Sequence, residues 1–271
     1  MSGTHSGFVR HRFRLCQAQI QALSGTYSDL VRHKTSGQHM MANKVDAGLW
    51  LTRLITVVFT ILFILPLLGG DTYSFYQRAL ISCAASSALR LHQRIPNFQL
   101  SREFLGRLFL EDSCHYLVYA VLFINIYPIT MALIPAFLFA LLHACSYTKT
   151  ILNLMGPQSM MFLRNMIAKL EQQQTNVLRF IACNEIFLMP AIIILSFTGK
   201  ASLFMPFVYY RFLSMRYASR RNPYCRTLFS ELKLTIEYLC AKPQCPQIVK
   251  TGLYNCIALV TRLAPQSEPA Q

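Results

Sequence analysis

The chain arranges its hydrophobic and polar positions in long blocks. The longest block, residues 113–148, has thirty-six positions without Asp, Glu, Lys or Arg, and Pro128 and Pro135 interrupt it. About 20 apolar residues cross a bilayer core of roughly 30 Å as a helix. The block therefore predicts either one long kinked span or two shorter segments that fold back at the prolines. The stretch from Asn125 to Pro128 suits such a break, although membrane helices also tolerate proline.

Two further blocks have the same character. Residues 54–70 follow Trp50 and Arg53, an aromatic and a cation that suit the headgroup level at the start of a span. Residues 180–198 form a mainly apolar stretch that Asn184, Glu185 and Pro190 interrupt. Hydrophobic residues make up 54% of the chain and the mean hydropathy is +0.35, values typical of a multi-pass membrane protein. We predict an all-α, multi-pass integral membrane protein with hydrophobic hairpin segments and amphipathic interfacial helices.

The polar ends divide the chain into four expected regions. Residues 1–40 are rich in Ser, Gly, His and Gln and predict a disordered tail. We expect no cleaved signal peptide, because no continuous apolar stretch precedes the first hydrophobic block. Residues 41–215 form the predicted membrane domain, residues 216–265 a basic amphipathic helical region, and residues 266–271 a disordered end.

Amphipathic segments lie between and after the hydrophobic blocks. Ser101 suits a helix cap, and four apolar residues share one face of the helix that would follow. Two apolar stripes after Pro223 predict interfacial helices, which the following residues define: Leu228, Phe229, Leu232, Ile236, Val249, Leu253, Ile257 and Val260. Such helices either lie flat at the headgroups or pack on one another as a small helical domain, and the sequence leaves both readings open.

A formal net charge of +15 on a membrane protein indicates anionic lipid headgroups as partners. Five arginines fall within sixteen residues and are the candidate headgroup ligands: Arg211, Arg216, Arg220, Arg221 and Arg226. After Gly199 the chain has ten Lys and Arg against three acids, which predicts a cytosolic C-terminus. The side of the N-terminus stays open. Nucleic acid is not an expected partner, since the basic residues flank hydrophobic segments, where snorkelling accounts for them.

An enzyme is the alternative that the cluster from Glu111 to His115 suggests. It contains two carboxylates, a thiol and an imidazole at the start of a hydrophobic helix. Carboxylates in a first helical turn also favour the positive end of the helix dipole, and few further histidines are available. The nine cysteines include no CxxC pair and are read as buried thiols. We therefore predict no catalytic residue, metal or cofactor.

Asn184 and Glu185 are the polar side chains inside the last hydrophobic block. An ionisable group in hydrocarbon costs about 2.5–3.5 kcal/mol on insertion scales, so Glu185 is expected to face a partner or water. An ion-conducting or ion-regulating role is one reading. The other is that Glu185 pairs with a neighbour such as Arg179 or bonds another helix.

Five strings of residues carry a resemblance to a known family: SFYQRAL at 74–80, ALRLHQR at 88–94, LEDSCHY at 110–116, FIACNEIFLMP at 180–190 and SRRNPYCR at 219–226. They closely resemble the transmembrane protein thirty-three family, which includes Krüppel homologue two and yeast pore-membrane protein relatives. The resemblance extends over about residues 40–265 and leaves the first forty residues without a counterpart.

The resemblance implies a protein of the endoplasmic reticulum membrane and nuclear envelope without catalytic activity. It implies partners among reticulon-type membrane proteins, nucleoporins and a nuclear import receptor. It also implies that the matching C-terminal region, residues 223–263, binds membrane. A function in shaping tubular membrane and in supporting nuclear pore organisation is the resulting expectation.

Overall fold

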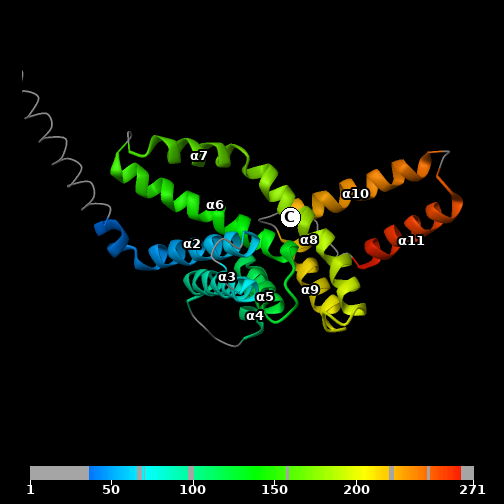
Figure 1. Cartoon of the computed structure of the whole chain (residues 1–271). Helices are drawn as coiled ribbons and strands as arrows, with labels where there is room; N and C mark the ends of the chain where they lie inside the picture. Colours follow the sequence, from blue (N-terminus) through cyan, green and yellow to red (C-terminus); the bar gives the residue numbers. More distant parts are fainter. Residues whose placement is uncertain are drawn as a thin grey trace, which may run out of the picture. The chain divides into compact units, whose positions relative to one another are not determined.

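A computed structural model of the chain consists of helices in every regular element that it describes (Figure 1). The structure describes residues 37–65, 69, 71–96, 101–156, 159–219, 223–242 and 245–263. The helices are α2 (Lys44–Ile64), α3 (Thr72–Arg94), α4 (Arg102–Phe109), α5 (Asp112–Ile124), α6 (Thr130–Met155), α7 (Met161–Gln172), α8 (Gln174–Phe197), α9 (Met205–Ala218), α10 (Tyr224–Ala241) and α11 (Gln247–Leu263). The predicted all-α class is confirmed.

Three helices are long and apolar enough to cross a membrane: α2, α6 and α8. The helix α5 is apolar but has only 13 residues. Each hydrophobic block of the sequence overlaps one of these helices, but all three helices extend beyond their blocks: α6 ends at Met155, and α8 begins at Gln174. The helix α2 begins at Lys44, ten residues before the predicted apolar block. Its first turns are polar, so a search for apolar residues does not find them, and Asp46 in the first turn stabilises the positive end of the helix dipole.

The chain separates into two compact units. One unit comprises the described residues up to Gly48 together with Cys145–Lys169, and the other comprises Leu49–Ala144 and the described residues from Leu170 onwards. The second unit, which we call the hairpin unit, contains most of the helices and all of the site described below. The domain boundaries expected from the sequence stay predictions.

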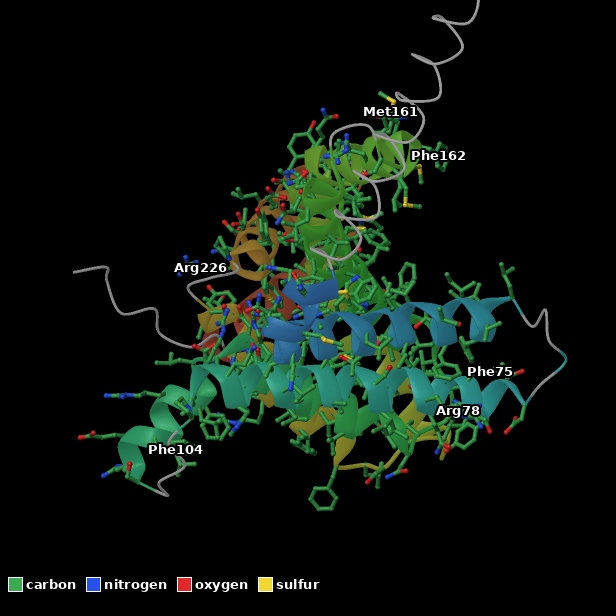
Figure 2. All side chains as sticks on the ribbon, turned by 90° about the vertical axis from the view of Figure 1, so that its left-hand side faces the viewer. Phe75, Arg78, Phe104, Met161, Phe162 and Arg226 are labelled. Carbon is green, nitrogen blue, oxygen red and sulfur yellow. The ribbon has the colours of Figure 1, made fainter. Side chains whose placement is uncertain are left out.

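The first helical hairpin of the hairpin unit joins α2 and α3. The hydroxyls of Thr56 and Ser82 lie 2.7 Å apart in a buried hydrogen bond. Nearer the turn, the rings of Phe59 and Phe75 stack with centroids 6.1 Å apart. Later residues of α2 thus meet earlier residues of α3, so the two helices run antiparallel, side by side in Figure 2.

The second hairpin answers the question that residues 113–148 left open. Helix α5 ends at Ile124 and α6 begins at Thr130, with Pro128 in the turn between them. The Tyr119 hydroxyl donates to the Ala132 carbonyl at 2.9 Å. The Tyr116 ring contacts the Phe139 ring, with centroids 4.7 Å apart. The block is therefore two antiparallel helices, and the hairpin reading is confirmed, whereas Pro135 lies inside the continuous helix α6.

The third hairpin joins α8 and α9. The Ser196 hydroxyl donates to the Ser202 carbonyl at 3.1 Å near the turn, and the Tyr209 hydroxyl donates to the Glu185 carbonyl at 2.8 Å further along. Antiparallel packing also joins α3 to α5, because Gln77 reaches the Ile124 carbonyl at one end of the pair.

The three hairpin turns converge at one end of the hairpin unit, which we call the turn end. Thr72, Asn125 and Lys200, one residue from each turn region, line a common pocket there. The Lys200 ammonium lies 4.9 Å from the centroid of the Tyr127 ring. At the opposite end lie the start of α5 and the last turns of α3 and α9, which we call the basic end. Figure 2 shows Phe75 and Arg78 at one end of the α2–α3 pair and Phe104 and Arg226 at the other.

An aromatic core holds the hairpins together. Its centre is a fully buried group from α5 and α9: Tyr119, Phe123, Tyr209 and Phe212. Their ring centroids are 4.7 to 6.4 Å apart, the range in which offset and edge contacts stabilise aromatic pairs. Shorter α5 and α9 thereby pack between the longer helices.

Two amphipathic helices, α4 and α10, start at the basic end of the hairpins, and a third, α11, follows α10. The predicted cap of α4 is confirmed, since the Ser101 hydroxyl accepts from the Phe104 N–H at 3.1 Å. Helix α10 follows α9 and packs its first turns on α8 and α9, and α11 packs on α10.

In the other unit, the side chain of Arg164 closes the C-terminal end of α6. It donates to the Asn153 side chain at 2.8 Å and to the carbonyls of Leu152 and Gly156 at 3.0 and 3.1 Å. These carbonyls carry the negative end of the helix dipole, so a cation is stabilising there. Met161 and Phe162 of α7 are 63% and 79% exposed and visible in Figure 2.

Candidate functional site

A buried ion pair joins α8 to α9 at the basic end. The Arg216 Nε lies 3.1 Å from the Glu185 Oε2, and both side chains are 0% exposed. The sequence predicts Arg179 or another helix as the partner of Glu185. Arg179 instead forms an ion pair with Glu231 of α10 at 2.8 Å, so Glu185 bonds across to α9. The reason is the α8–α9 hairpin, which places residue 216 opposite residue 185.

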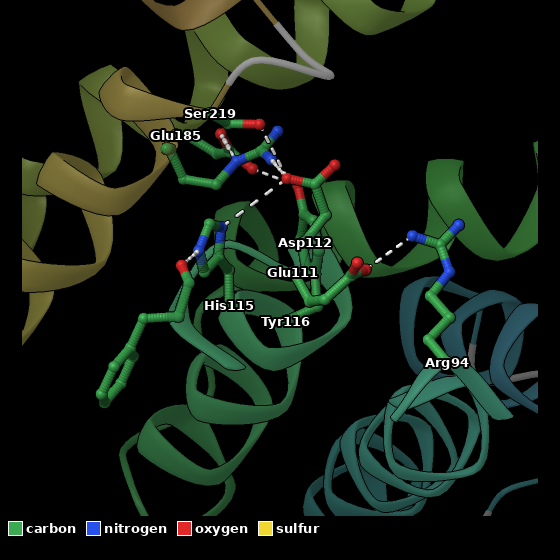
Figure 3. A network of polar contacts seen from close by, with 9 residues as sticks. Arg94, Glu111, Asp112, His115, Tyr116, Glu185 and Ser219 are labelled. Carbon is green, nitrogen blue, oxygen red and sulfur yellow. Dashed lines mark hydrogen bonds and ion pairs between the residues drawn. The ribbon is translucent and has the colours of Figure 1, made fainter. Parts of the chain in front are cut away.

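The pair extends to the start of α5, as Figure 3 shows. The Tyr116 hydroxyl donates to the Glu185 carboxylate. The Arg216 Nη1 lies 3.3 Å from the Asp112 carboxylate, to which the Ser219 hydroxyl also donates at 2.8 Å. The Tyr116 ring lies under the guanidinium, with the Arg216 Cζ 5.1 Å from its centroid. Three helices are thus tied together by one arginine.

Neighbouring polar residues of α5 face other partners. The Arg94 guanidinium of α3 lies 2.6 Å from the Glu111 carboxylate. The His115 Nε2 donates to the Phe109 carbonyl at 2.7 Å, which ties α5 to the end of α4. Glu111 and His115, which the enzyme reading combined, therefore bind separate groups, while the His115 Nδ1 lies 3.7 Å from the Asp112 carboxylate, as Figure 3 shows. The described residues contain no group of three or more His, Cys, Asp or Glu able to hold a metal ion.

Two features make this network a device for joining helices rather than an open site. Glu185 and Arg216 are fully buried, so each needs the charge of the other. Asn184 next to Glu185 is 7% exposed and donates to the Met131 carbonyl of α6 at 2.8 Å. Both polar residues of the last hydrophobic block thus bond other helices.

The candidate headgroup arginines divide into three groups. Arg211 and Arg226 are exposed, as the expectation requires. Arg216 is buried and paired with two carboxylates, which differs from the expected surface position because α9 turns it into the hairpin unit. Arg220 and Arg221 lie outside the described residues.

The candidate interfacial residues are partly packed and partly exposed, and their contact with headgroups stays a prediction. Leu228 and Phe229 of α10 pack on a buried cluster of α8 and α9. Leu232, Ile236, Leu253 and Ile257 are half-buried, and Val249 and Val260 are 46% exposed. The helices therefore pack at their base and keep apolar side chains on the surface, among them Ile248, which is 87% exposed.

Sequence reasoning missed Tyr116, Tyr209 and Ser219 as partners in the network. The sequence did contain one usable signal. Glu185 is the single acid of residues 180–198, and Arg216 belongs to the segment that follows, and opposite charges in adjacent membrane segments tend to pair. The tyrosines gave no such signal, since core tyrosines are common in apolar helices.

Comparison with known proteins supports the resemblance. Residues 31–266 match the family described as Transmembrane protein 33/Nucleoporin POM33. The human protein named Transmembrane protein 33 is 56% identical over 229 residues, which cover 84% of this chain and 93% of the relative. The Drosophila melanogaster protein named Krueppel homolog 2 is 46% identical over 235 residues, which cover 86% of this chain and 83% of the relative.

A more distant relative and the solved structures complete the comparison. The Caenorhabditis elegans protein named Transmembrane protein 33 homolog is 40% identical over 239 residues, which cover 86% of each chain. No solved structure is significantly similar. The match over nearly all of the helical region shows that the chain belongs to the Transmembrane protein 33/Nucleoporin POM33 family.

Proposed function

We propose that this protein shapes or organises tubular membrane of the endoplasmic reticulum and nuclear envelope and supports nuclear pore organisation, through non-catalytic contacts with lipid and protein. The family description includes a nucleoporin, which supports the nuclear-envelope part. The proposed partners are anionic lipids, reticulon-type membrane proteins, nucleoporins and a nuclear import receptor.

The observation that carries the proposal is the asymmetry of the hairpin unit. Its three turns lie at the turn end, while α4 and α10 start from the basic end and α11 follows α10 and packs on it. Amphipathic helices at one membrane face expand only the leaflet on that face, so the membrane bends with this leaflet on the convex side. Exposed Arg211 and Arg226 add cations for anionic headgroups at the same end.

The depth of the hairpins supports the same function. Helix α5, with 13 residues, and α9, with 14, are about 20 Å long, whereas the hydrocarbon core is roughly 30 Å thick. Lys200 and Asp71 near the turns favour contact with the opposite surface. Because α2, α6 and α8 are long enough to cross, thinning of the bilayer is expected only beside the short helices α5 and α9.

The orientation follows from the arginines. Arg78 of α3 and Lys200 lie at the turn end, whereas the basic end has Arg53 of α2, Arg90 and Arg94 of α3, and Arg216 of α9. We infer that the basic end is cytosolic, so that the chain enters and leaves the hairpins on the cytosolic side.

The test charges the exposed face of α11 in the full-length protein. Ile248 and Leu259, 87% and 58% exposed, lie three helical turns apart on one face. When the purified protein is reconstituted into vesicles, Ile248→Glu/Leu259→Glu should abolish the formation of tubules. Thr251→Glu/Asn255→Glu is the control, because it adds the same charge at exposed polar positions of the same helix. Equal tubulation by the two variants would contradict the proposal.

A further inference from the structure

A cavity of about 180 Å³ lies at the basic end beside the buried ion network. Four arginines from three helices line it: Arg53 of α2, Arg90 and Arg94 of α3, and Arg216 of α9. These residues are up to 163 positions apart in the sequence and meet only because the hairpins are antiparallel. The cavity is therefore a built feature of the hairpin unit rather than a local run of basic residues.

One donor in this cavity is left over from the ion network. The Arg216 side chain is 0% exposed, and its Nη2 has no hydrogen-bond partner among the described residues. A buried guanidinium nitrogen without an acceptor is costly. Because Arg216 lines the cavity, an acceptor bound there would satisfy this donor.

The charge of the lining favours an anion. Among the residues that line the cavity, Asp112 is the single acid, and it already accepts from Arg216 and Ser219. Arg94 pairs with Glu111, and Arg53 and Arg90 add two further half-buried guanidinium groups. Within the lining itself, four guanidinium groups stand beside one carboxylate, that of Asp112.

Polar residues of α3 and α5 complete the lining. Ser86 and Ser87 of α3 belong to it, and the Ser86 hydroxyl donates to the Cys83 carbonyl at 2.9 Å, a bond that it would exchange for one to a phosphate oxygen. Ser113 brings the first turn of α5, a helix of 13 residues whose free N–H groups and dipole favour a negative charge. Guanidinium forks, hydroxyls and a helix N-terminus together are the usual ligands of phosphate.

We propose that this cavity binds a phosphate-bearing anion. Arg53 of the lining follows Trp50, and both residues suit the headgroup level, where the phosphate of an anionic lipid is available. A soluble phosphate has the same phosphate group. The depth of the cavity in the membrane rests on the orientation proposed above. The ability of the lining to bind an anion does not depend on that orientation. Binding measured in detergent solution therefore tests this proposal separately from the proposed role in membrane curvature.

The experiment measures binding to purified full-length protein in neutral detergent by calorimetry, with short-chain phosphatidic acid and with inorganic phosphate as separate ligands. Fluorescence of Trp50, the single tryptophan of the chain, is a second readout for the wild type. Saturable binding of phosphatidic acid that millimolar phosphate does not displace assigns a lipid headgroup. Binding of both ligands, with competition, assigns the phosphate group itself. Absence of saturable binding of either ligand overturns the proposal.

The variants localise the binding. Arg53→Gln/Arg90→Gln should weaken it at least about tenfold, since each charged hydrogen bond that is lost costs roughly that factor. Arg102→Gln/Arg107→Gln, at exposed positions of α4 at the same end, should stay within about twofold because it removes the same charge outside the cavity. Arg90→Gln alone serves if the double variant does not fold. Equal weakening by the cavity and α4 variants would show attraction to net charge only and overturn the proposal.

Discussion

Glu185 and Arg216 lie thirty-one residues apart and form an ion pair of 3.1 Å in which both side chains are completely buried. Tyr116 and Asp112 of α5 bind the same two side chains, so the pair connects three helices. Helices in lipid gain little from the hydrophobic effect between them, and polar bonds of this kind therefore select which helices associate.

The first prediction concerns the cost of breaking the pair. Arg216→Met should lower the free energy of unfolding in micelles by about 3–5 kcal/mol, because it leaves the Glu185 charge buried without its partner. Arg179→Gln, which removes an exposed arginine of the same region, should cost less than about 1 kcal/mol. Denaturant titration of helical circular dichroism measures both.

A double variant separates charge from packing. Glu185→Gln/Arg216→Met should be more stable than Arg216→Met, because the fully buried charge of Glu185 is removed and only the partly exposed Asp112 loses its cation. If the double variant loses the sum of the two single effects, the pair does not couple α8 to α9 as described.

The second prediction concerns orientation. A spacer-flanked glycosylation acceptor placed in the α8–α9 turn at Lys200 should be modified in endoplasmic reticulum microsomes, because this turn faces the lumen in the proposed arrangement. The same acceptor placed between α10 and α11 should stay unmodified. Modification between α10 and α11 would reverse the orientation, and modification at neither position would mean that the hairpins end inside the bilayer.

The third prediction concerns the α2–α3 hairpin. Thr56→Val removes the buried hydroxyl that lies 2.7 Å from the Ser82 hydroxyl and should cost about 0.6–1.7 kcal/mol, the range for such bonds in membrane proteins. Thr52→Val should have a smaller effect, because the Thr52 hydroxyl donates to the Leu49 carbonyl of its own helix. Thermal unfolding of the two variants in the same micelle compares them, and equal losses would count against the interhelical bond.

The fourth prediction concerns two thiols of the C-terminal helices. Burial, together with the nearby charge of Glu185, raises the pKa of the Cys225 thiol to about 12, whereas Cys256 of α11 is exposed. Because the thiolate is the reactive form, Cys256 should be alkylated near neutral pH well before Cys225. Mass spectrometry of tryptic peptides after timed alkylation measures the order. Comparable rates at the two positions in the folded protein would show that α10 does not pack on α8 and α9.

Local signals in the sequence predicted a large part of the fold. The Ser101 cap, the break after Asn125 and the helix that follows Pro223 are found where the sequence placed them. Each depends on a few adjacent residues whose backbone preferences act over one turn. The start of α2 at Lys44 was missed because charged residues can belong to a helix without belonging to its apolar span.

The partners of the polar side chains were less predictable. Glu185 was correctly expected to need a partner, but Arg179 is used by Glu231. The surface role expected for Arg216 depended on its neighbours in sequence, whereas its burial depends on α5 and α8.

The sequence by itself determined that the chain enters a membrane, since runs of apolar residues long enough for a bilayer have no other stable environment. It also determined that the C-terminal part of the chain is basic, because the ten Lys and Arg and the three acids after Gly199 can be counted directly. Only the tertiary structure decided which charges meet. The antiparallel hairpins bring Arg53, Arg90, Arg94 and Arg216 around one cavity and seal Glu185 against Arg216. Such contacts join residues far apart in the chain, and no local preference specifies them.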